Sequence, residues 1–207
     1  MVVIHIAGPP SSGKTTLART LISRFPTLLV LDLDDVNREF VEKHKLLQLL
    51  RTRPVEFQAL YQKHIDKLVR SAHRSNQPLV FVGIEGVVLG TQPGKDFLTV
   101  DLNADVRLCL NIPTAENVRR WIQRDFVYAL DDYATSLKQD VTHHFNQYKN
   151  NEKEFVKKRE TNFHALMRDF RPSQRTREIE RFKTHYKSLG FRFVSSETAV
   201  EIVSQLI

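Results

Sequence analysis

A short apolar run followed at once by a glycine-rich motif is the feature that most restricts how this chain can fold. Residues 2–7 read VVIHIA, and the residues from Gly8 to Thr16, GPPSSGKTT, match the pattern G-x-x-x-x-G-K-[ST]. Glycines at both ends of such a loop allow close backbone approach, so successive N–H groups can point at phosphate oxygens. The pattern predicts a buried strand, a phosphate-binding loop and a helix that begins near Lys14.

The residue types in this loop predict how ATP and Mg²⁺ would be held. The N-terminus of the helix adds the positive end of its dipole. Lys14 is expected to reach the β- and γ-phosphates, and Thr15 is expected to place its hydroxyl on Mg²⁺. The residues expected to bind the nucleotide are Gly8, Pro10, Ser11, Ser12, Gly13, Lys14, Thr15 and Thr16.

Apolar runs alternate with helical patterns along the chain. Strands are expected at 2–7, 27–33, 79–84, 106–112 and 191–196, where short runs are rich in Val, Ile, Leu and Phe. Between the second and third runs, Phe57, Tyr61, Ile65 and Val69 recur at helical spacing. This alternation predicts an α/β fold, with a five-stranded, mostly parallel sheet flanked by helices and ligands at the carboxyl ends of the strands.

The stretch from Pro113 to about Leu189 is polar, mostly helix-compatible and free of convincing strand patterns. It is far longer than one crossover helix needs, so we expect several helices, broken near RPSQR at 171–175, with some of them forming a mobile lid. No internal repeat, low-complexity tract or flexible linker interrupts the sequence. We therefore expect residues 1–207 to form a single domain with a helical lid or insertion at roughly 114–189.

The composition narrows the cellular setting. A hydrophobic content of 41% and a charged content of 27% are ordinary for a soluble globular protein. No apolar run approaches the ~20 residues needed to span a bilayer, and the N-terminus lacks the basic leader of a signal peptide. The single cysteine, Cys109, lies inside an apolar run and is expected to be a buried strand residue. We expect a cytoplasmic protein with no membrane partner.

The net charge of +7 is concentrated in one late segment. Between Lys149 and Lys187 there are twelve Lys and Arg residues against six Asp and Glu residues. This segment is either a solvated helical face or a surface that attracts an anionic partner such as a nucleic acid.

Three aspartates mark the end of the second predicted strand. Asp32, Asp34 and Asp35 repel one another unless Mg²⁺, a substrate hydroxyl or a cation compensates. A helix N-cap accounts for one of them. In such sheets the second strand ends beside the glycine-rich loop, so Asp34 or Asp35 could accept the proton of an attacking hydroxyl. Arg38 could hold an anionic group or pair with Asp34.

These motifs together resemble the P-loop kinases that phosphorylate nucleosides, nucleotides and other metabolites, and the uridine kinase-like branch fits best. Members of that branch carry an aspartate after strand two, a Glu-Gly pair after strand three and a lid that begins Arg-Arg-x-x-Arg-Asp. Over roughly residues 2–125, the matching residues are Asp34 or Asp35, Glu85-Gly86, and Arg119-Arg120 with Arg124-Asp125. After Arg-Asp the branch usually has a glycine and a further arginine, whereas this chain has FVYALDDY.

The resemblance implies an enzyme that moves the γ-phosphate of ATP to a hydroxyl or phosphate of a nucleoside or nucleotide. It implies that Asp34 or Asp35 is the base, that Glu85 helps to hold Mg²⁺ and that the lid arginines neutralise the transferring phosphate. The residues alone leave other uses open. Glu85 could be a turn residue, and the arginines could pair with Glu116 and Asp125 on an exposed helix, although paired guanidinium groups also suit phosphate oxygens.

Two alternatives remain from the sequence. The first is a 5′-hydroxyl polynucleotide kinase or another small-metabolite kinase. Residues 8–38 resemble the start of 5′-hydroxyl polynucleotide kinases. However, the third predicted strand lacks the Asp-x-Thr-Asn-like ending of those enzymes. The second is an NTPase switch or binding module, although LNIPTAEN stands where a guanine-specificity motif would follow strand four. Acceptor identity and oligomeric state are open.

Overall fold

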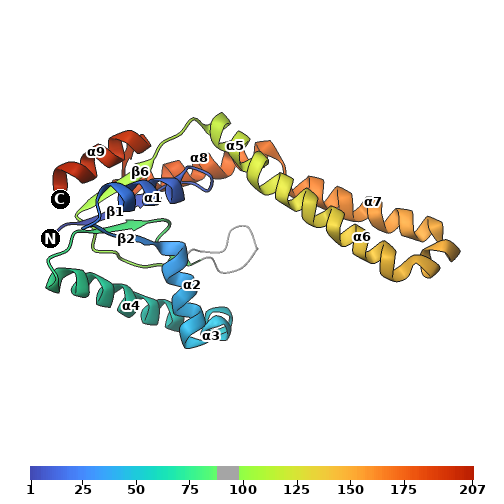
Figure 1. Cartoon of the computed structure of the whole chain (residues 1–207), viewed down its shortest axis with the longest axis horizontal. Helices are drawn as coiled ribbons and strands as arrows, with labels where there is room; N and C mark the ends of the chain where they lie inside the picture. The colour runs from blue at the N-terminus through green and yellow to red at the C-terminus, as the bar shows by residue number, and fades with distance from the viewer. Residues whose placement is uncertain (88–97) are drawn as a thin grey trace. The chain divides into compact units, whose positions relative to one another are not determined.

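The structure is a computed structural model that describes residues 1–87 and 98–207 (Figure 1). The elements of the described residues follow in chain order: β1 (Val3–Ala7), α1 (Lys14–Arg24), β2 (Leu29–Asp32), α2 (Leu33–His44), α3 (Leu47–Thr52), α4 (Pro54–Arg74), β3 (Leu79–Val82), β4 (Gly86–Val87), β5 (Leu98–Thr99), β6 (Val106–Leu110), α5 (Thr114–Trp121), the π-helix η1 (Ile122–Phe126), α6 (Val127–Asn150), α7 (Glu152–Asp169), α8 (Pro172–Ser188), β7 (Arg192–Val194) and α9 (Ser196–Leu206). The chain forms two compact units: a sheet unit, Met1–Ile112 with Thr184–Ile207, and a helical unit, Pro113–Lys183.

The sheet unit is built on a five-stranded sheet with the order β2-β3-β1-β6-β7. All four pairings in this sheet are parallel, with His5 of β1 opposite Phe81 of β3 and Arg107 of β6. The predicted α/β sheet is therefore confirmed, and it is parallel throughout rather than mostly parallel. The sequence did not predict the short antiparallel pair of β4 and β5, whose strands have two residues each.

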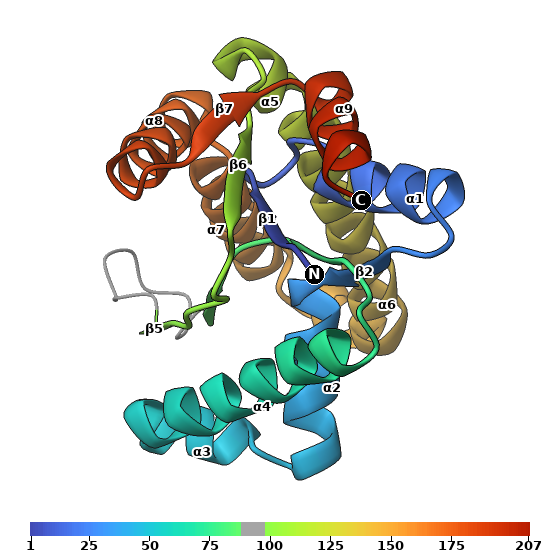
Figure 2. The same cartoon turned by 90° about the vertical axis from the view of Figure 1, so that its left-hand side faces the viewer.

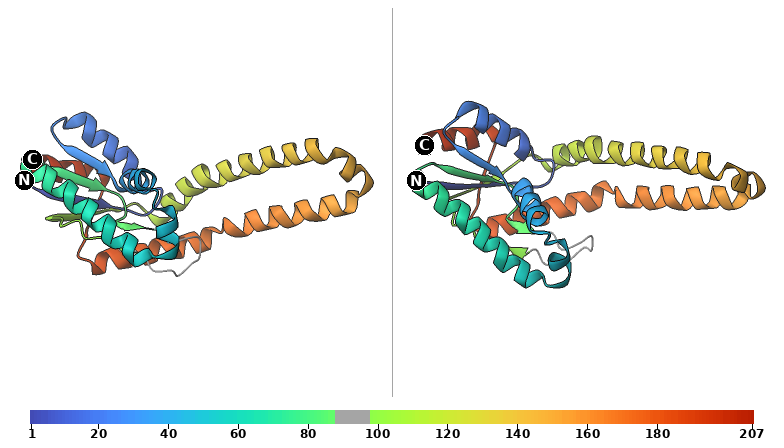
Figure 3. Two further views of the ribbon diagram at one scale, coloured as in Figure 1. Left: turned by 90° about the horizontal axis from the view of Figure 1, so that it is seen from below. Right: turned by 60° about the horizontal axis from the view of Figure 1, so that its bottom comes forward.

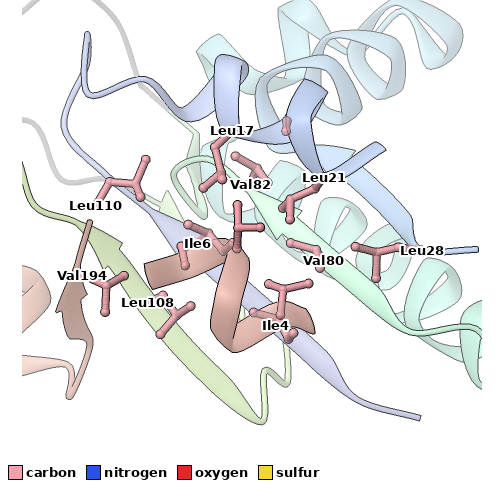
Figure 4. Close-up of a cluster of buried hydrophobic side chains, with 14 residues drawn as sticks. Ile4, Ile6, Leu17, Leu21, Leu28, Val80, Val82, Leu108, Leu110 and Val194 are labelled. Atoms are coloured by element: carbon pink, nitrogen blue, oxygen red, sulfur yellow. The ribbon is translucent and has the colours of Figure 1, made fainter. Parts of the chain in front are cut away.

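Helices cover both faces of this sheet (Figure 2). Because side chains alternate along a strand, Ile4 and Ile6 face α1 and α9, whereas Val3 faces α2 and α4. Figure 4 shows the first of these two cores, in which buried Leu17 and Leu21 of α1 meet strand residues from β1, β3, β6 and β7. The opposite core packs the α4 stripe, including Phe57, Tyr61 and Ile65, against α2, β1 and β3. Cys109 is fully buried, as predicted.

The order of the strands makes β1 and β3 a topological switch point of the sheet. β1 is followed along the chain by β2, which lies beyond β3 in the sheet, whereas β3 is followed by β6 of the main sheet, which lies beyond β1. At such a point, open α/β sheets usually bind ligands at the carboxyl ends of the strands. The residues that follow these strands are the glycine-rich loop (residues 8–13) and the segment that contains Glu85.

The helical unit contains α5, η1, α6, α7 and most of α8, and no strand occurs in its described residues. Helices α6 and α7 run antiparallel and side by side (Figures 1 and 3). The Tyr133 hydroxyl of α6 donates to the Arg159 carbonyl of α7 at 3.2 Å, and Arg159 pairs with Asp140. The predicted break at 171–175 lies where α7 ends at Asp169 and α8 begins at Pro172, a residue suited to a first helical position.

Candidate functional site

The glycine-rich loop turns between β1 and α1, and the Ser12 N–H donates to the Pro9 carbonyl oxygen at 3.1 Å. Ser11 and Gly13 have φ angles of 66° and 94°, so both lie in the left-handed region, which Gly13 adopts without a side-chain penalty. At Gly8, a Cβ atom would lie 2.5 Å from the Ser12 hydroxyl oxygen and 3.1 Å from the Leu110 Cβ atom, so a side chain there would require its neighbours to shift. Glycine thus allows close approach at this end of the loop, as in loops that bind anions through backbone N–H groups.

Helix α1 begins directly after this loop, with Gly13 as its N-cap. No side chain caps its N-terminus, and its first turn holds no acidic residue. The first turn of α1 therefore carries no negative side chain of its own, which suits an anionic ligand. Lys14, the first residue of α1, donates from Nζ to the carbonyl oxygens of Gly8 at 2.8 Å and Pro9 at 3.2 Å.

The serine and threonine hydroxyls of the loop region provide a test of whether a nucleotide phosphate fits here. The hydroxyl oxygens of Ser11 and Ser12 are shielded from solvent, and neither has a hydrogen-bond partner among residues 1–87 and 98–207. Burying a hydroxyl without a partner is unfavourable, so a phosphate oxygen would satisfy both. Thr15 and Thr16 are exposed at the start of α1, and Pro10 is exposed in the loop. The residues present therefore fit a phosphate chain.

The three aspartates after β2 have three different surroundings. Asp32 is the N-cap of α2, where its Oδ1 accepts from the Asp34 N–H at 3.0 Å. Asp35 pairs with Arg38 at 2.6 Å on the surface. Arg38 thus pairs with Asp35 rather than Asp34, because the i, i+3 spacing brings these two side chains together. Asp34 is exposed, and its carboxylate accepts no hydrogen bond within the described chain.

The pKa of Asp32 is affected by the neighbouring carboxylates. Burial raises the pKa of Asp32, and the charges of Asp34 and Asp35 raise it further. The hydrogen bond from the Asp34 N–H and the charge of Lys14 act in the opposite direction. The positive charge of Lys14, the first residue of α1, thus acts on the carboxylate at the end of β2.

Glu85 follows β3 and is only 8% exposed. Its Oε2 accepts a 2.7 Å hydrogen bond from the hydroxyl of Tyr186, a buried residue of α8 in the sheet unit. His5 of β1 lies on the same carboxylate, with Nε2 at 3.7 Å from Oε2. This distance is too long for a hydrogen bond. Instead, His5 Nε2 lies 3.0 Å from the carbonyl oxygen of Gly83, and since a carbonyl only accepts, Nε2 carries the proton.

The pKa shifts of His5 and Tyr186 agree with the hydrogen bonds that these two side chains form. Burial lowers the pKa of His5, although the nearby Glu85 carboxylate opposes that shift. Burial and the Glu85 carboxylate raise the pKa of Tyr186, so its hydroxyl stays protonated and remains a donor. Sequence reasoning missed both partners of Glu85. His5 could have been noticed because it is the one polar residue in the apolar run VVIHIA. No local pattern around Tyr186 indicates that it contacts Glu85, which lies 101 positions earlier in the chain.

The three arginines of the predicted lid lie in the helical unit, and each forms an ion pair there. Arg119 binds Glu116 through both oxygens at 2.7 and 2.8 Å, and Arg120 shares that carboxylate at 2.7 Å. Arg124 lies in the π-helical turn η1 and donates to Asp125 at 2.5 and 3.0 Å. All three guanidinium groups are solvent-exposed. Exposed pairs of this kind contribute little stability, so a phosphate could replace either carboxylate.

A π-helical turn within a longer helix is uncommon and is often found at functional sites. Here it stands between α5 and α6, next to a small aromatic cluster. Trp121 stacks on Phe170 with ring centroids 5.2 Å apart, and the Arg175 guanidinium lies 5.4 Å from the Trp121 ring. Trp121 therefore packs against residues of the helical unit itself.

Two wider features of the described residues concern metals and membranes. Residues 1–87 and 98–207 contain no cluster of three or more His, Cys, Asp or Glu side chains that could hold a metal ion. Mg²⁺ bound with a nucleotide generally uses phosphates, waters and only one or two protein groups. In the same residues, none of the helices has the length and apolar character to cross a bilayer.

Comparison with known proteins identifies no family for this chain. No protein-family model and no curated protein matches it. Among solved structures, the crystal structure of TT1252 from Thermus thermophilus is similar, at 24% identity over 60% of this chain and 72% of that chain, with a TM-score of 0.37. A similarity at this level assigns no activity to this chain.

Proposed function

We propose that this chain has a P-loop kinase fold and is a Mg²⁺- and ATP-dependent phosphotransferase whose acceptor is a nucleoside or nucleotide. The observation that carries the proposal is the glycine-rich loop. Gly8 packs closely against Ser12, Gly13 has a left-handed φ, the two serine hydroxyls are buried without a partner in the described chain, and the loop leads into a helix with no acidic residue in its first turn. Each of these properties suits a phosphate chain.

ATP supplies the transferable phosphoryl group, and Mg²⁺ would offset the charge that develops during transfer. Lys14 and the loop N–H groups would hold the phosphate oxygens, Thr15 would direct its hydroxyl to the metal, and Glu85 would support the metal from the end of β3. Lys14 already binds carbonyl oxygens of the loop. In the proposed complex, Lys14 Nζ would exchange these acceptors for phosphate oxygens.

Asp34 is the preferred base because Asp32 caps a helix and Asp35 is paired with Arg38. In the proposed reaction the acceptor oxygen forms a bond to the γ-phosphorus, the bond to the β–γ bridging oxygen breaks, and the acceptor proton passes to Asp34. Arg120 and Arg124, with Arg119, would exchange their carboxylate partners for phosphate oxygens. Paired guanidinium groups provide the forked donors that such oxygens accept.

The acceptor test uses the purified protein, labelled ATP and Mg²⁺. Candidate acceptors are nucleosides, nucleoside monophosphates, sugars and 5′-hydroxyl oligonucleotides, each present in separate reactions. We expect label on a nucleoside or nucleoside monophosphate. Label on oligonucleotides alone would replace this acceptor with a nucleic acid end, and label released only as free phosphate would replace the kinase with an NTPase.

Replacement of Lys14 tests the donor half of the site. Lys14→Ala is expected to lower kcat by about 100-fold or more, the cost typical of removing a donor from developing negative charge, and to weaken ATP binding. Arg19→Ala removes an exposed cation from the same helix and is expected to behave as the wild type. Retention of full ATP-dependent activity by Lys14→Ala would overturn the phosphotransferase assignment.

A nucleic acid acceptor is the second candidate, and one observation favours it. Helices α7 and α8 carry exposed cationic side chains: Lys153, Lys157, Lys158, Arg168, Arg177 and Arg181. A nucleic acid end brings several phosphates, so such a surface would strengthen its binding. The acceptor panel separates this candidate from a small-molecule kinase.

A further inference from the structure

Glu85 is held by a hydroxyl that comes from the far end of the sequence. Within the sheet unit, the Tyr186 O–H donates to Glu85 Oε2 at 2.7 Å, and both side chains are almost fully buried. The bond joins the segment after β3 to the last turn of α8. A buried hydrogen bond to a charged group is among the stronger kinds, so this contact fixes the direction in which the carboxylate points.

We propose that Tyr186 is a positioning residue that orients the Glu85 carboxylate toward the metal of a bound nucleotide, through the hydroxyl bond at Oε2. This inference rests on the function proposed above, in which Glu85 supports Mg²⁺ at the carboxyl ends of β1 and β3. A carboxylate has two oxygens, each able to accept or to coordinate. Oε2 is occupied by Tyr186, whereas Oε1 accepts no hydrogen bond from residues 1–87 or 98–207 and would be the oxygen that coordinates the metal.

The surroundings of Tyr186 hold its ring in one orientation. Phe191 packs edge-on against Tyr186, with ring centroids 4.8 Å apart, and edge-on against His5 at 5.1 Å. All three rings are buried. A ring fixed on its edges leaves the hydroxyl little freedom, so the donor is already in place before a ligand binds.

His5 contributes by occupying space rather than by donating a proton to Glu85. Its Nε2–H is used by the Gly83 carbonyl at 3.0 Å, and that oxygen belongs to the turn that leads from β3 to Glu85. The hydrogen bond to the Glu85 carboxylate therefore comes from Tyr186 and not from His5. His5 instead holds the Gly83 carbonyl, two residues before Glu85. The alternative is that Glu85 and Tyr186 only satisfy each other inside the core, with no effect on a ligand.

Tyr186→Phe distinguishes the two possibilities because it keeps the ring packing and removes only the hydroxyl. Positioning predicts that kcat falls by about 10-fold or more, the usual effect of removing a partner of a metal ligand, while KM for ATP stays near the wild-type value. The Mg²⁺ concentration for half-maximal rate should rise. Tyr133→Phe is the matched control, since it removes a hydrogen-bonded hydroxyl within the helical unit.

A binding measurement gives a second readout that does not need turnover. Mn²⁺ affinity, measured by electron paramagnetic resonance with a non-hydrolysable ATP analogue, should fall by about 10-fold in Tyr186→Phe and be unchanged in Tyr133→Phe. A double-mutant cycle completes the test: in a Glu85→Gln background, the additional Tyr186→Phe change should have no further effect, because Tyr186 acts only through Glu85.

The outcomes separate this inference from the proposed function. If the wild type transfers phosphate and Tyr186→Phe matches it in kcat, Mg²⁺ dependence and Mn²⁺ affinity, the positioning role is wrong and the phosphotransferase stands. If thermal unfolding alone changes, the contact is structural and the positioning role is again wrong. If the wild type transfers no phosphate to any acceptor yet Tyr186→Phe weakens Mn²⁺ binding, the positioning role stands and the transferase assignment fails.

Discussion

At the scale of single residues, the end of β2 shows how three identical carboxylates acquire three roles. Asp32 is used by the backbone of α2, Asp35 is used by Arg38, and Asp34 faces solvent. The sequence predicts that one of the three is a cap but not which one, because the choice depends on where the strand stops. Here β2 ends at Asp32, so the helix begins one residue later and Asp32 becomes the N-cap.

The different surroundings of Asp34 and Asp35 predict different effects when each is replaced by asparagine. Asp34→Asn should retain ATP binding and lower kcat by about 100-fold, within the range for loss of a general base. Asp35→Asn should change kcat by less than about 3-fold, because an exposed ion pair with Arg38 contributes little. Steady-state kinetics with the acceptor found in the panel, together with ATP titration, measures both.

A reversal of this order would make Asp35 the base and leave Asp34 as a surface residue. Normal turnover in both variants would mean that no carboxylate at the end of β2 serves as the base. Asp32→Asn is not an equivalent test, because it would also weaken the cap of α2.

At the scale of elements, α5 brings two arginine side chains onto one glutamate, Glu116. Arg119 and Arg120 converge on Glu116 through i, i+3 and i, i+4 spacings. The hydrogen bonds from Arg119 and Arg120 lower the pKa of Glu116 to about 2 from an ordinary value of 4.5. Because the folded pKa lies below the unfolded one, this pairing adds stability above about pH 4.5, and the contribution is lost as the pH falls toward 2.

Glu116→Gln should therefore reduce the loss of thermal stability between pH 4.5 and pH 2. The effect will be small, since the pairs are exposed, and the difference between the two unfolding curves isolates it from the other carboxylates. Added salt should diminish it further. Identical pH dependence of the unfolding midpoint in the wild type and Glu116→Gln would contradict this prediction.

The elements also show what sequence patterns can and cannot predict. The five strands of the main sheet and the α4 stripe were predictable because buried parallel strands and amphipathic helices leave local patterns. The two-residue strands β4 and β5 are too short to leave one. The η1 turn has an α-helical sequence, IQRDF, and differs only in hydrogen-bond register. The Glu85–Tyr186 bond joins residues 101 positions apart, so only the folded sheet brings them together.

At the scale of the whole molecule, the excess of positive charge is concentrated in one late segment of the chain. The excess of positive charge that the sequence places at Lys149–Lys187 falls mostly on α7 and α8, with several exposed side chains. The sequence predicted this concentration but left open whether it is solvated or binds an anionic partner. An exposed basic surface attracts polyanions even without a sequence-specific site.

We therefore expect single-stranded oligonucleotides to bind weakly and with strong salt dependence. Replacement of Lys153, Lys157 and Lys158 by Gln should reduce the slope of log affinity against log salt by about 2, since each phosphate contact contributes about 0.7. The matched control replaces Lys43, Lys63 and Lys67 of the sheet unit, which are equally exposed. Fluorescence anisotropy at several salt concentrations measures both slopes. Equal slopes in the two variants would mean that α7 contacts no phosphate.

The order of the strands has a consequence for how the protein is made. β6 pairs with β7, yet β7 begins at Arg192, after the whole helical unit has followed β6. At ~5–20 residues per second, the ribosome needs roughly 4–16 s to synthesise the intervening chain. During that interval β6 is an edge strand with unpaired backbone groups, a surface that promotes association between chains. Nascent chains stalled before residue 192 should thus bind chaperones more strongly than the full-length chain does.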